Sequence, residues 1–395
     1  MNVSPDIDST TAERVGLDPG ALRRLSSRIE QDVNDGRYLG ASILLARSGV
    51  VGYRDTIGQV APGRAAAADD VYLLMSLSKA FTAVLVLRAI DHGRFTLDTR
   101  ISEILPAFGA GGKQRVTVRH LLTHTAGTYA GFPPPPPLTM AKDVGDLAAN
   151  VRLISLLPAA NTPGERVVYN PFASYAVLGQ VLVDTDPDGR SFGTIARQDL
   201  FEPLGMTDTS YGLAVNAPRR VPVSVPATDG AVVSGAMMEI LNQAFTEESE
   251  HPAGGAFGTV EDVYRFAEAL RRCGDTGEYR VISQSLFHYA CRNHTGDRSN
   301  GFWDFDRQAR DLPDFPANFS LLGGYVRGDG HYLSALGHTA SPRAFGAVGG
   351  GSTLWMVDPD RDLTFVFLSA RFLEGLDHFK RLQQLSDLAL AAAVD

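Results

Sequence analysis

The sequence predicts an α/β (α+β) fold in which both ends of the chain build one antiparallel sheet with flanking helices. Two strand-like runs lie near each end, while helical patterns and long loops dominate the middle. At 395 residues the chain is also too long for one ordinary core. We therefore expect an α/β domain from residues 1–79 and 331–395. Residues 80–330 are expected to form a mostly helical inserted domain.

The N-terminal elements are a helix and a hairpin. Residues 18–36 begin with an Asp-Pro start signal, carry apolar residues at helical spacing and end at Gly36. Residues 40–58, "GASILLARSGVVGYRDTIG", contain two β-rich runs joined by the turn "RSG". The chain is thus expected to begin as helix, strand, strand.

The C-terminal elements mirror this order. Residues 352–370, "STLWMVDPDRDLTFVFLSA", contain two apolar strand-like runs joined by "DPDRD", and residues 374–394 form an amphipathic helical pattern. In the middle of the chain, Pro133–Pro137 must be extended. This proline run is expected to be either a surface spacer or a stiff wall beside a pocket.

Charge and composition limit the possible partners. The net charge is −9 and no basic cluster is present, which argues against nucleic acid or an anionic membrane as partner. The N-terminal residues lack the apolar segment of a signal peptide, and no apolar run reaches membrane-spanning length. We expect a cytoplasmic protein acting on a small molecule, as either a monomer or a homodimer.

A lysine in an apolar passage is the first indication of catalysis. The chain has four lysines, and Lys79 is followed by the apolar run "AFTAVLVLRAI". Burial there would lower its pKa and let it accept a proton near neutrality. Ser76 lies three residues earlier, so a helix would bring the two side chains together as nucleophile and base. The alternative is a lysine whose ammonium group simply reaches water at the start of a helix.

Three further motifs follow this S-x-x-K pair in order. They are "VTVRHLLTHTAG" at 116–127, "PGERVVYNPFASYAVLG" at 163–179 and "RAFGAVGGGSTLWMVDP" at 343–359. Together with Ser76 and Lys79, this series resembles the serine β-lactamase-related family. That family includes the family VIII carboxylesterases, class C β-lactamases and D-Ala-D-Ala carboxypeptidases.

The resemblance implies a role for each motif. Ser76 would be the nucleophile, and Lys79 and Tyr169 a coupled proton-transfer pair in which the base is left unassigned. The backbone N–H group of Ser76 and that of Val348 or its neighbour on the Gly-rich strand would bind the oxyanion. The remaining residues expected to bind substrate on the same strand are Phe345, Gly346, Ala347 and Gly349. No metal or cofactor is required, and the histidines of "HLLTHTAG" are expected to be structural.

Two departures from the family pattern bear on the substrate. Pro171 stands where many relatives have an Asn that helps to bind the substrate amide. Phe345 stands at the position that we align with the lysine of β-lactamases, which meets the β-lactam carboxylate. Both differences favour neutral ester substrates. A competing alignment would place "HTAS", residues 338–341, at this position instead.

The leading hypothesis is therefore a carboxylesterase that forms an acyl-enzyme on Ser76. The enzymatic alternatives are a β-lactamase or D-alanyl peptidase, and an acyltransferase acting on a secondary metabolite. A catalytically silent binding relative is the non-enzymatic alternative. No G-x-S-x-G motif surrounds any serine, which excludes the α/β-hydrolase class.

Overall fold

The computed structural model describes residues 9–130, 143–224, 235–330, 332–373 and 375–394. The proline run Pro133–Pro137 lies outside these ranges, so its expected role stays a prediction.

The largest element is a seven-stranded antiparallel sheet that joins both ends of the chain. Its strand order is β3-β2-β1-β11-β10-β9-β8. The central pair is β1 with β11, in which Ala41 lies opposite Ser369 and Arg47 opposite Leu363. The fold class predicted from the sequence is thus confirmed. The strands are β1 (Gly40–Arg47), β2 (Val50–Ala61), β3 (Arg64–Ala65), β8 (Tyr325–Val326), β9 (Phe345–Gly349), β10 (Thr353–Asp358) and β11 (Leu363–Ser369).

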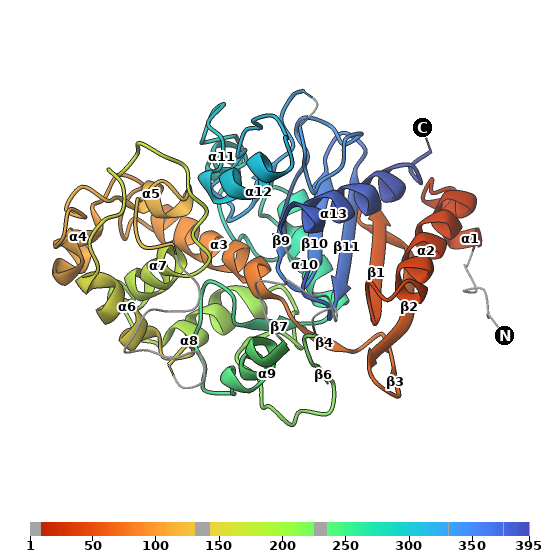
Figure 1. Cartoon of the computed structure of the whole chain (residues 1–395), viewed down its shortest axis with the longest axis horizontal. Coiled ribbons are helices and arrows are strands. Elements are labelled where there is room, and N and C mark those ends of the chain that lie inside the picture. Colours follow the sequence, from red (N-terminus) through yellow and green to blue (C-terminus); the bar gives the residue numbers. More distant parts are fainter. Residues whose placement is uncertain (1–8, 131–142, 225–234, 331, 374, 395) are drawn as a thin grey trace.

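Helices cover both faces of this sheet (Figure 1). Helices α2 (Pro19–Asn34) and α13 (Gly375–Leu390) pack against each other and against β2 and β11. Helix α10 (Val260–Arg271) packs against β1, β10 and β11 from the other face. Residues of α10 and β8 belong by sequence to the range expected for the insertion, and here they contact or join the sheet. The division into two domains stays a prediction.

Local chemistry explains the ends of the first elements. The Asp18 carboxylate accepts a 2.7 Å hydrogen bond from Gly20 N and caps the start of α2. Between β1 and β2, Ser48 and Gly49 both have positive φ, 52° and 75°. Two such residues form the tight turn whose twist matches that of a β-hairpin.

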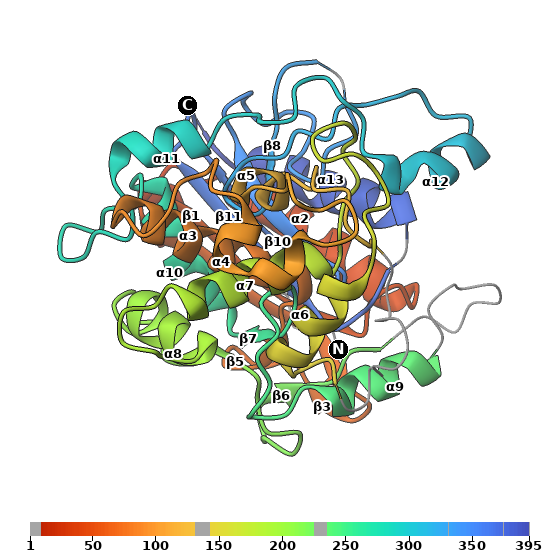
Figure 2. The ribbon, with the colours of Figure 1, turned by 90° about the vertical axis from the view of Figure 1, so that its left-hand side faces the viewer.

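The part of the molecule that surrounds α3 (Ser78–Asp91) and α7 (Ala173–Asp184) is mostly helical (Figure 2). Helix α7 packs against α3, α5 and α6, which gives this part its core. The helices here and elsewhere are α1 (Ser9–Arg14), α3 (Ser78–Asp91), α4 (Ile101–Ile104), α5 (Val118–Leu122), α6 (Leu147–Leu156), α7 (Ala173–Asp184), α8 (Phe192–Ala196), α9 (Gly235–Ala244), α11 (Gln284–Ala290) and α12 (Asp304–Ala309). The 3₁₀ helices are η1 (Met75–Leu77), η2 (Pro106–Gly109) and η4 (Gly301–Trp303), and η3 (Arg197–Phe201) is a π-helix.

A small four-stranded sheet leads the chain into α3. Its strand order is β5-β7-β4-β6. Strand β4 directly precedes η1 and α3, so the pairing of β4 fixes where α3 begins. Across the described ranges, no helix has the length and apolar character needed to cross a membrane. The strands are β4 (Val71–Leu73), β5 (Ser210–Tyr211), β6 (Arg220–Val221) and β7 (Ala256–Gly258).

Candidate active site

Ser76 lies on a strained turn between β4 and α3. It occupies the middle of η1, and its side chain is partly exposed. Met75, directly before it, has a positive φ of 46°, a conformation that is costly for a residue with a side chain. The start of a helical segment also leaves backbone N–H groups without partners inside the helix. The turn therefore presents a hydroxyl group together with free backbone donors.

Lys79 is buried one turn further on, where it contacts Ser76. Its side chain is only 1% exposed, and Nζ lies 3.1 Å from Ser76 Oγ. Nζ also donates hydrogen bonds to the backbone oxygens of Pro171, at 2.9 Å, and Ala253, at 2.7 Å. Burial lowers the pKa of Lys79 to about 7. The neutral amine is therefore accessible near pH 7.

Tyr169 approaches Ser76 from a different part of the chain. Its hydroxyl group donates a 2.7 Å hydrogen bond to Ser76 Oγ. Lys79 Nζ lies 5.2 Å from the centre of the tyrosine ring. Burial raises the pKa of Tyr169 to about 12, although the hydrogen bond with Ser76 acts in the opposite direction. The phenol is therefore protonated at neutral pH and can act as a proton donor.

The "HLLTHTAG" motif holds the loop that carries Tyr169. The ring of the buried His124 packs 4.7 Å from that of Tyr169, and its Nδ1 accepts a 3.0 Å hydrogen bond from Asn170 N. Burial keeps the pKa of His124 well below its usual range, so the ring is neutral. His120 Nδ1 accepts a hydrogen bond from Thr117 N at the start of α5. Both histidines thus make structural contacts, as expected from the sequence.

Asn170 has no free amide group to offer a substrate. Its Nδ2 donates to Tyr129 O at 2.6 Å, and its Oδ1 accepts from the backbone N–H groups of Phe172 and Ser174. The next residue, Pro171, contributes its carbonyl oxygen to Lys79. This segment therefore fixes the start of α7 and the position of the lysine.

Asn300 is a site residue that the sequence analysis missed. Its Oδ1 accepts a 2.9 Å hydrogen bond from Tyr169 N and a 3.1 Å hydrogen bond from Phe302 N. The Phe302 ring lies edge-on to the Tyr169 ring, 5.5 Å from it. The sequence carries no motif around Asn300 that could have indicated this contact, since the two segments meet only in the folded chain.

Strand β9 presents an unpaired backbone edge beside the turn of Ser76. Arg327 N donates to Ala344 O, so the backbone groups of Ala344 face β8. Alternate residues of a strand face the same edge, which turns the N–H of Val348 in this direction too. Strand β8 does not extend as far as Val348, because its first residue, Tyr325, pairs with Gly346. The N–H of Val348 is thus not used by β8.

Gly349 makes the close approach of β9 to Ser76 possible. A Cβ atom at this position would lie 2.4 Å from Leu74 O and 3.4 Å from Ser76 N. Any side chain would therefore collide with the backbone in front of the serine. Ala347, two residues earlier, is buried in the core that also contains the α10 residues.

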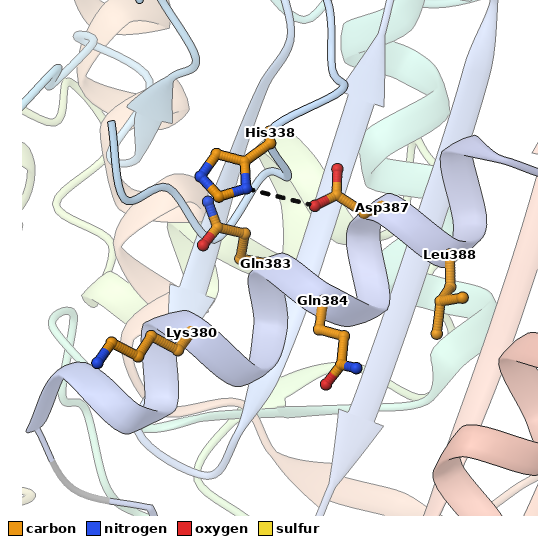
Figure 3. Close-up of a pocket in the computed structure, with 6 residues that line it drawn as sticks. All are labelled: His338, Lys380, Gln383, Gln384, Asp387 and Leu388. Carbon is orange, nitrogen blue, oxygen red and sulfur yellow. Dashed lines mark ion pairs between the residues drawn. The ribbon is translucent and has the colours of Figure 1, made fainter. Parts of the chain in front are cut away.

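Phe345 lies in the hydrophobic core, and His338 lies near α13. Phe345 is 3% exposed, and its ring packs edge-on against those of Phe287 and Trp355. His338 lies beside α13, where its Nδ1 is 3.9 Å from a carboxylate oxygen of Asp387 (Figure 3). Together with side chains of α13, His338 lines a surface hollow of about 300 Å³, and Ser76 is not among the residues that line it. The structure thus gives His338 no contact with the serine, in contrast to the competing alignment.

No metal site accompanies this arrangement in the ranges that the structure describes. There, no three His, Cys, Asp or Glu side chains lie close enough to share an ion. The chemistry offered by the described residues is that of a hydroxyl nucleophile with an amine and a phenol as proton carriers.

Comparisons with known proteins find relatives in sequence and in fold. The esterase EstB of Burkholderia gladioli is 28% identical over 292 residues, which cover 65% of this chain and 71% of EstB. A penicillin-binding protein homologue from Caulobacter crescentus has 23% identity and a TM-score of 0.73, with 95% of this chain and 99% of that chain covered. A family VIII carboxylesterase has 20% identity and a TM-score of 0.73, with 94% and 98% covered.

The two solved structures show that this chain shares their fold. The family itself is shown by a match to a family model. A family model described as Beta-lactamase matches residues 25–389. The resemblance predicted from the motifs is thereby confirmed. Because the match covers most of the sequence, the chain belongs to the Beta-lactamase family of serine hydrolases.

Proposed function

We propose that this chain is a carboxylesterase that cleaves esters through an acyl-enzyme on Ser76. The observation that carries the proposal is the environment of one atom. Ser76 Oγ lies 3.1 Å from Lys79 Nζ and accepts a 2.7 Å hydrogen bond from the Tyr169 hydroxyl group. A buried amine and a phenol on the same oxygen provide both proton carriers that acyl transfer needs.

Hydrogen-bond counting favours Lys79 as the base. A neutral amine has two N–H groups and one lone pair. The carbonyl oxygens of Pro171 and Ala253 accept the two N–H groups. The lone pair then points to Ser76, whose hydroxyl hydrogen it can take. A pKa lowered to about 7 makes this neutral form available at physiological pH.

The reaction then proceeds in two halves. Lys79 takes the proton of Ser76 as Oγ forms a bond to the ester carbonyl carbon, and the N–H groups of Ser76 and Val348 bind the oxyanion. Tyr169 gives its proton to the departing alkoxide and regains one from the Lys79 ammonium group. Water then forms a bond to the acyl carbon while one of its protons passes to Tyr169 and the Tyr169 proton passes to Lys79. The bond from the acyl carbon to Ser76 Oγ breaks, Lys79 returns a proton to Oγ, and the carboxylic acid leaves.

Two residues favour esters over β-lactams or D-Ala peptides. Pro171 has no side-chain amide, and the neighbouring Asn170 amide is fully occupied within the fold. Phe345 carries no charge that could meet a substrate carboxylate. The similarity to EstB, which is described as an esterase, supports the same substrate class.

The proposal is tested with a chromogenic short-chain ester, a penicillin and a D-Ala-D-Ala peptide. We expect turnover of the ester, no comparable turnover of the other two, and loss of turnover in Ser76→Ala. Ester turnover that is undiminished in Ser76→Ala, or a preference for the penicillin, would contradict it.

A further inference from the structure

The residues after Asn300 are fastened to the loop that carries Tyr169. Besides the bond from Tyr169 N to Asn300 Oδ1, Gly301 N donates a 2.9 Å hydrogen bond to Val167 O. On the other side of the segment, Trp303 packs edge-on against a phenylalanine of α13 at 5.2 Å. The segment is therefore held in place from two directions.

Phe302 is the residue of this segment that faces the catalytic tyrosine. Its ring lies 5.5 Å from that of Tyr169 in an edge-on arrangement, and it is 41% exposed. Its backbone N–H donates to Asn300 Oδ1, so the exposed ring has a defined position beside Tyr169. Tyr169 also stacks on Phe319 at 6.2 Å, so the exposed ring continues an aromatic cluster that reaches Ser76.

The mechanism proposed above determines which part of the substrate meets this ring. Tyr169 protonates the leaving alkoxide, so the alcohol part of the ester must lie against the tyrosine hydroxyl group. Of the rings that the structure places against Tyr169, those of His124 and Phe319 are buried, whereas that of Phe302 is exposed. The alcohol part is thus the part that extends towards Phe302.

We propose that Phe302 forms the wall of the alcohol-binding site and that the chain prefers esters of flat aromatic alcohols, such as arylmethyl esters. This inference rests on the proposed esterase function. An aromatic ring of the substrate can pack edge-on or offset against Phe302, and contacts of this kind correspond to about tenfold in affinity. A short alkyl alcohol offers no ring for this contact.

The test compares three esters by titrating the acid that is released. Benzyl acetate and propyl acetate share an acyl group and differ in the alcohol, whereas propyl phenylacetate carries its ring on the acyl side. We expect Phe302→Ala to lower the ratio of kcat/KM for benzyl over propyl acetate about tenfold. Phe302→Tyr should keep the ratio. The matched control is Phe305→Ala, which removes a ring that is 86% exposed on the same segment and should leave the ratio unchanged.

The possible results separate this inference from the proposed function. An unchanged ratio in Phe302→Ala, an equal loss for both acetates, or an effect confined to propyl phenylacetate would each overturn the alcohol site. A wild-type chain that cleaves propyl acetate without favouring benzyl acetate overturns the inference alone. A wild-type chain that cleaves none of the three esters contradicts the esterase function, and the inference falls with it.

Discussion

The hydroxyl group of Tyr169 donates a 2.7 Å hydrogen bond to Ser76 Oγ across a sequence separation of 93 residues. The two residues come from different motifs, one on the turn before α3 and one on the loop before α7. Helices α3 and α7 pack against each other, and this packing brings the motifs together. The packing of α3 on α7 therefore places the phenol of Tyr169 at the hydroxyl group of Ser76.

Removing only the hydroxyl group of Tyr169 should separate its chemical role from its packing role. Tyr169→Phe keeps the ring that contacts His124 and Phe302, so the fold should be retained. Loss of the proton donor should lower kcat by about 10²- to 10⁴-fold. The matched control is Tyr175→Phe, because the buried hydroxyl of Tyr175 donates to the backbone oxygen Leu122 O. Equal activity of the two variants would contradict the assigned role.

The pH dependence of kcat/KM should report the neutral form of Lys79. Its pKa is lowered to about 7 by burial, and only the deprotonated amine can take the serine proton. Activity should therefore rise as the pH increases through about 7 and then reach a plateau. The plateau should extend towards high pH, because the pKa of Tyr169 is raised to about 12. A profile that falls as the pH rises through 7 would show that the charged lysine is required.

Replacing the base by a group that cannot lose its proton provides a second test of the lysine. Arginine remains charged at all relevant pH values. Lys79→Arg should lower kcat/KM by about 10²-fold or more at every pH. Lys380→Arg, on the surface of α13, is the control that should leave both the rate and the pH profile unchanged. Retention of the wild-type profile in Lys79→Arg would exclude the amine as base.

Gly349 should tolerate no side chain, since a Cβ atom would lie 2.4 Å from Leu74 O. Gly349→Ala should displace the turn of Ser76 and lower kcat by about 10²-fold. Gly351→Ala is a close control, because its Cβ would have no neighbouring atom nearer than 3.6 Å. Steady-state kinetics of the two variants, with thermal unfolding to monitor the fold, would check the difference. Similar losses in both would contradict the steric explanation.

Introducing the lysine of the β-lactamases at Phe345 should damage the fold. The phenylalanine is 3% exposed and packs against two aromatic rings, so Phe345→Lys places a charge in the core. We expect a loss of about 3 kcal/mol or more in unfolding free energy and no gain of penicillin hydrolysis. Denaturant unfolding measures the first quantity. An unchanged stability would indicate that the side chain can reach a more polar environment.

Sequence patterns predicted the parts of the molecule that depend on local order. The cap at Asp18 and the turn at Ser48–Gly49 follow from rules that act over a few residues. The pairing of both ends of the chain followed from the strand runs in them. The Ser76 and Lys79 pair follows from helical spacing, and Tyr169 was identified through a family motif.

Other parts of the site depend on contacts that the sequence does not encode locally. Lys79 is bonded to the carbonyl oxygens of two distant segments, and any residue type could have supplied those oxygens. The amide of Asn300 acts on Tyr169 from 131 residues away. Helix α10 packs on the sheet, although its place in the sequence suggested the inserted domain. Hydrogen bonds to backbone atoms and packing between distant segments do not depend on local composition or residue spacing. Sequence patterns therefore could not reveal these contacts.

The central claim is that Ser76 is the nucleophile that becomes acylated. It is tested most directly by treating the wild-type protein with a serine-reactive phosphonate and locating the adduct by peptide mass spectrometry. We expect one adduct, on the peptide that contains Ser76, formed faster as the pH rises through about 7 and absent from Ser76→Ala. An adduct on another serine, or labelling that persists undiminished in Ser76→Ala, would contradict the account.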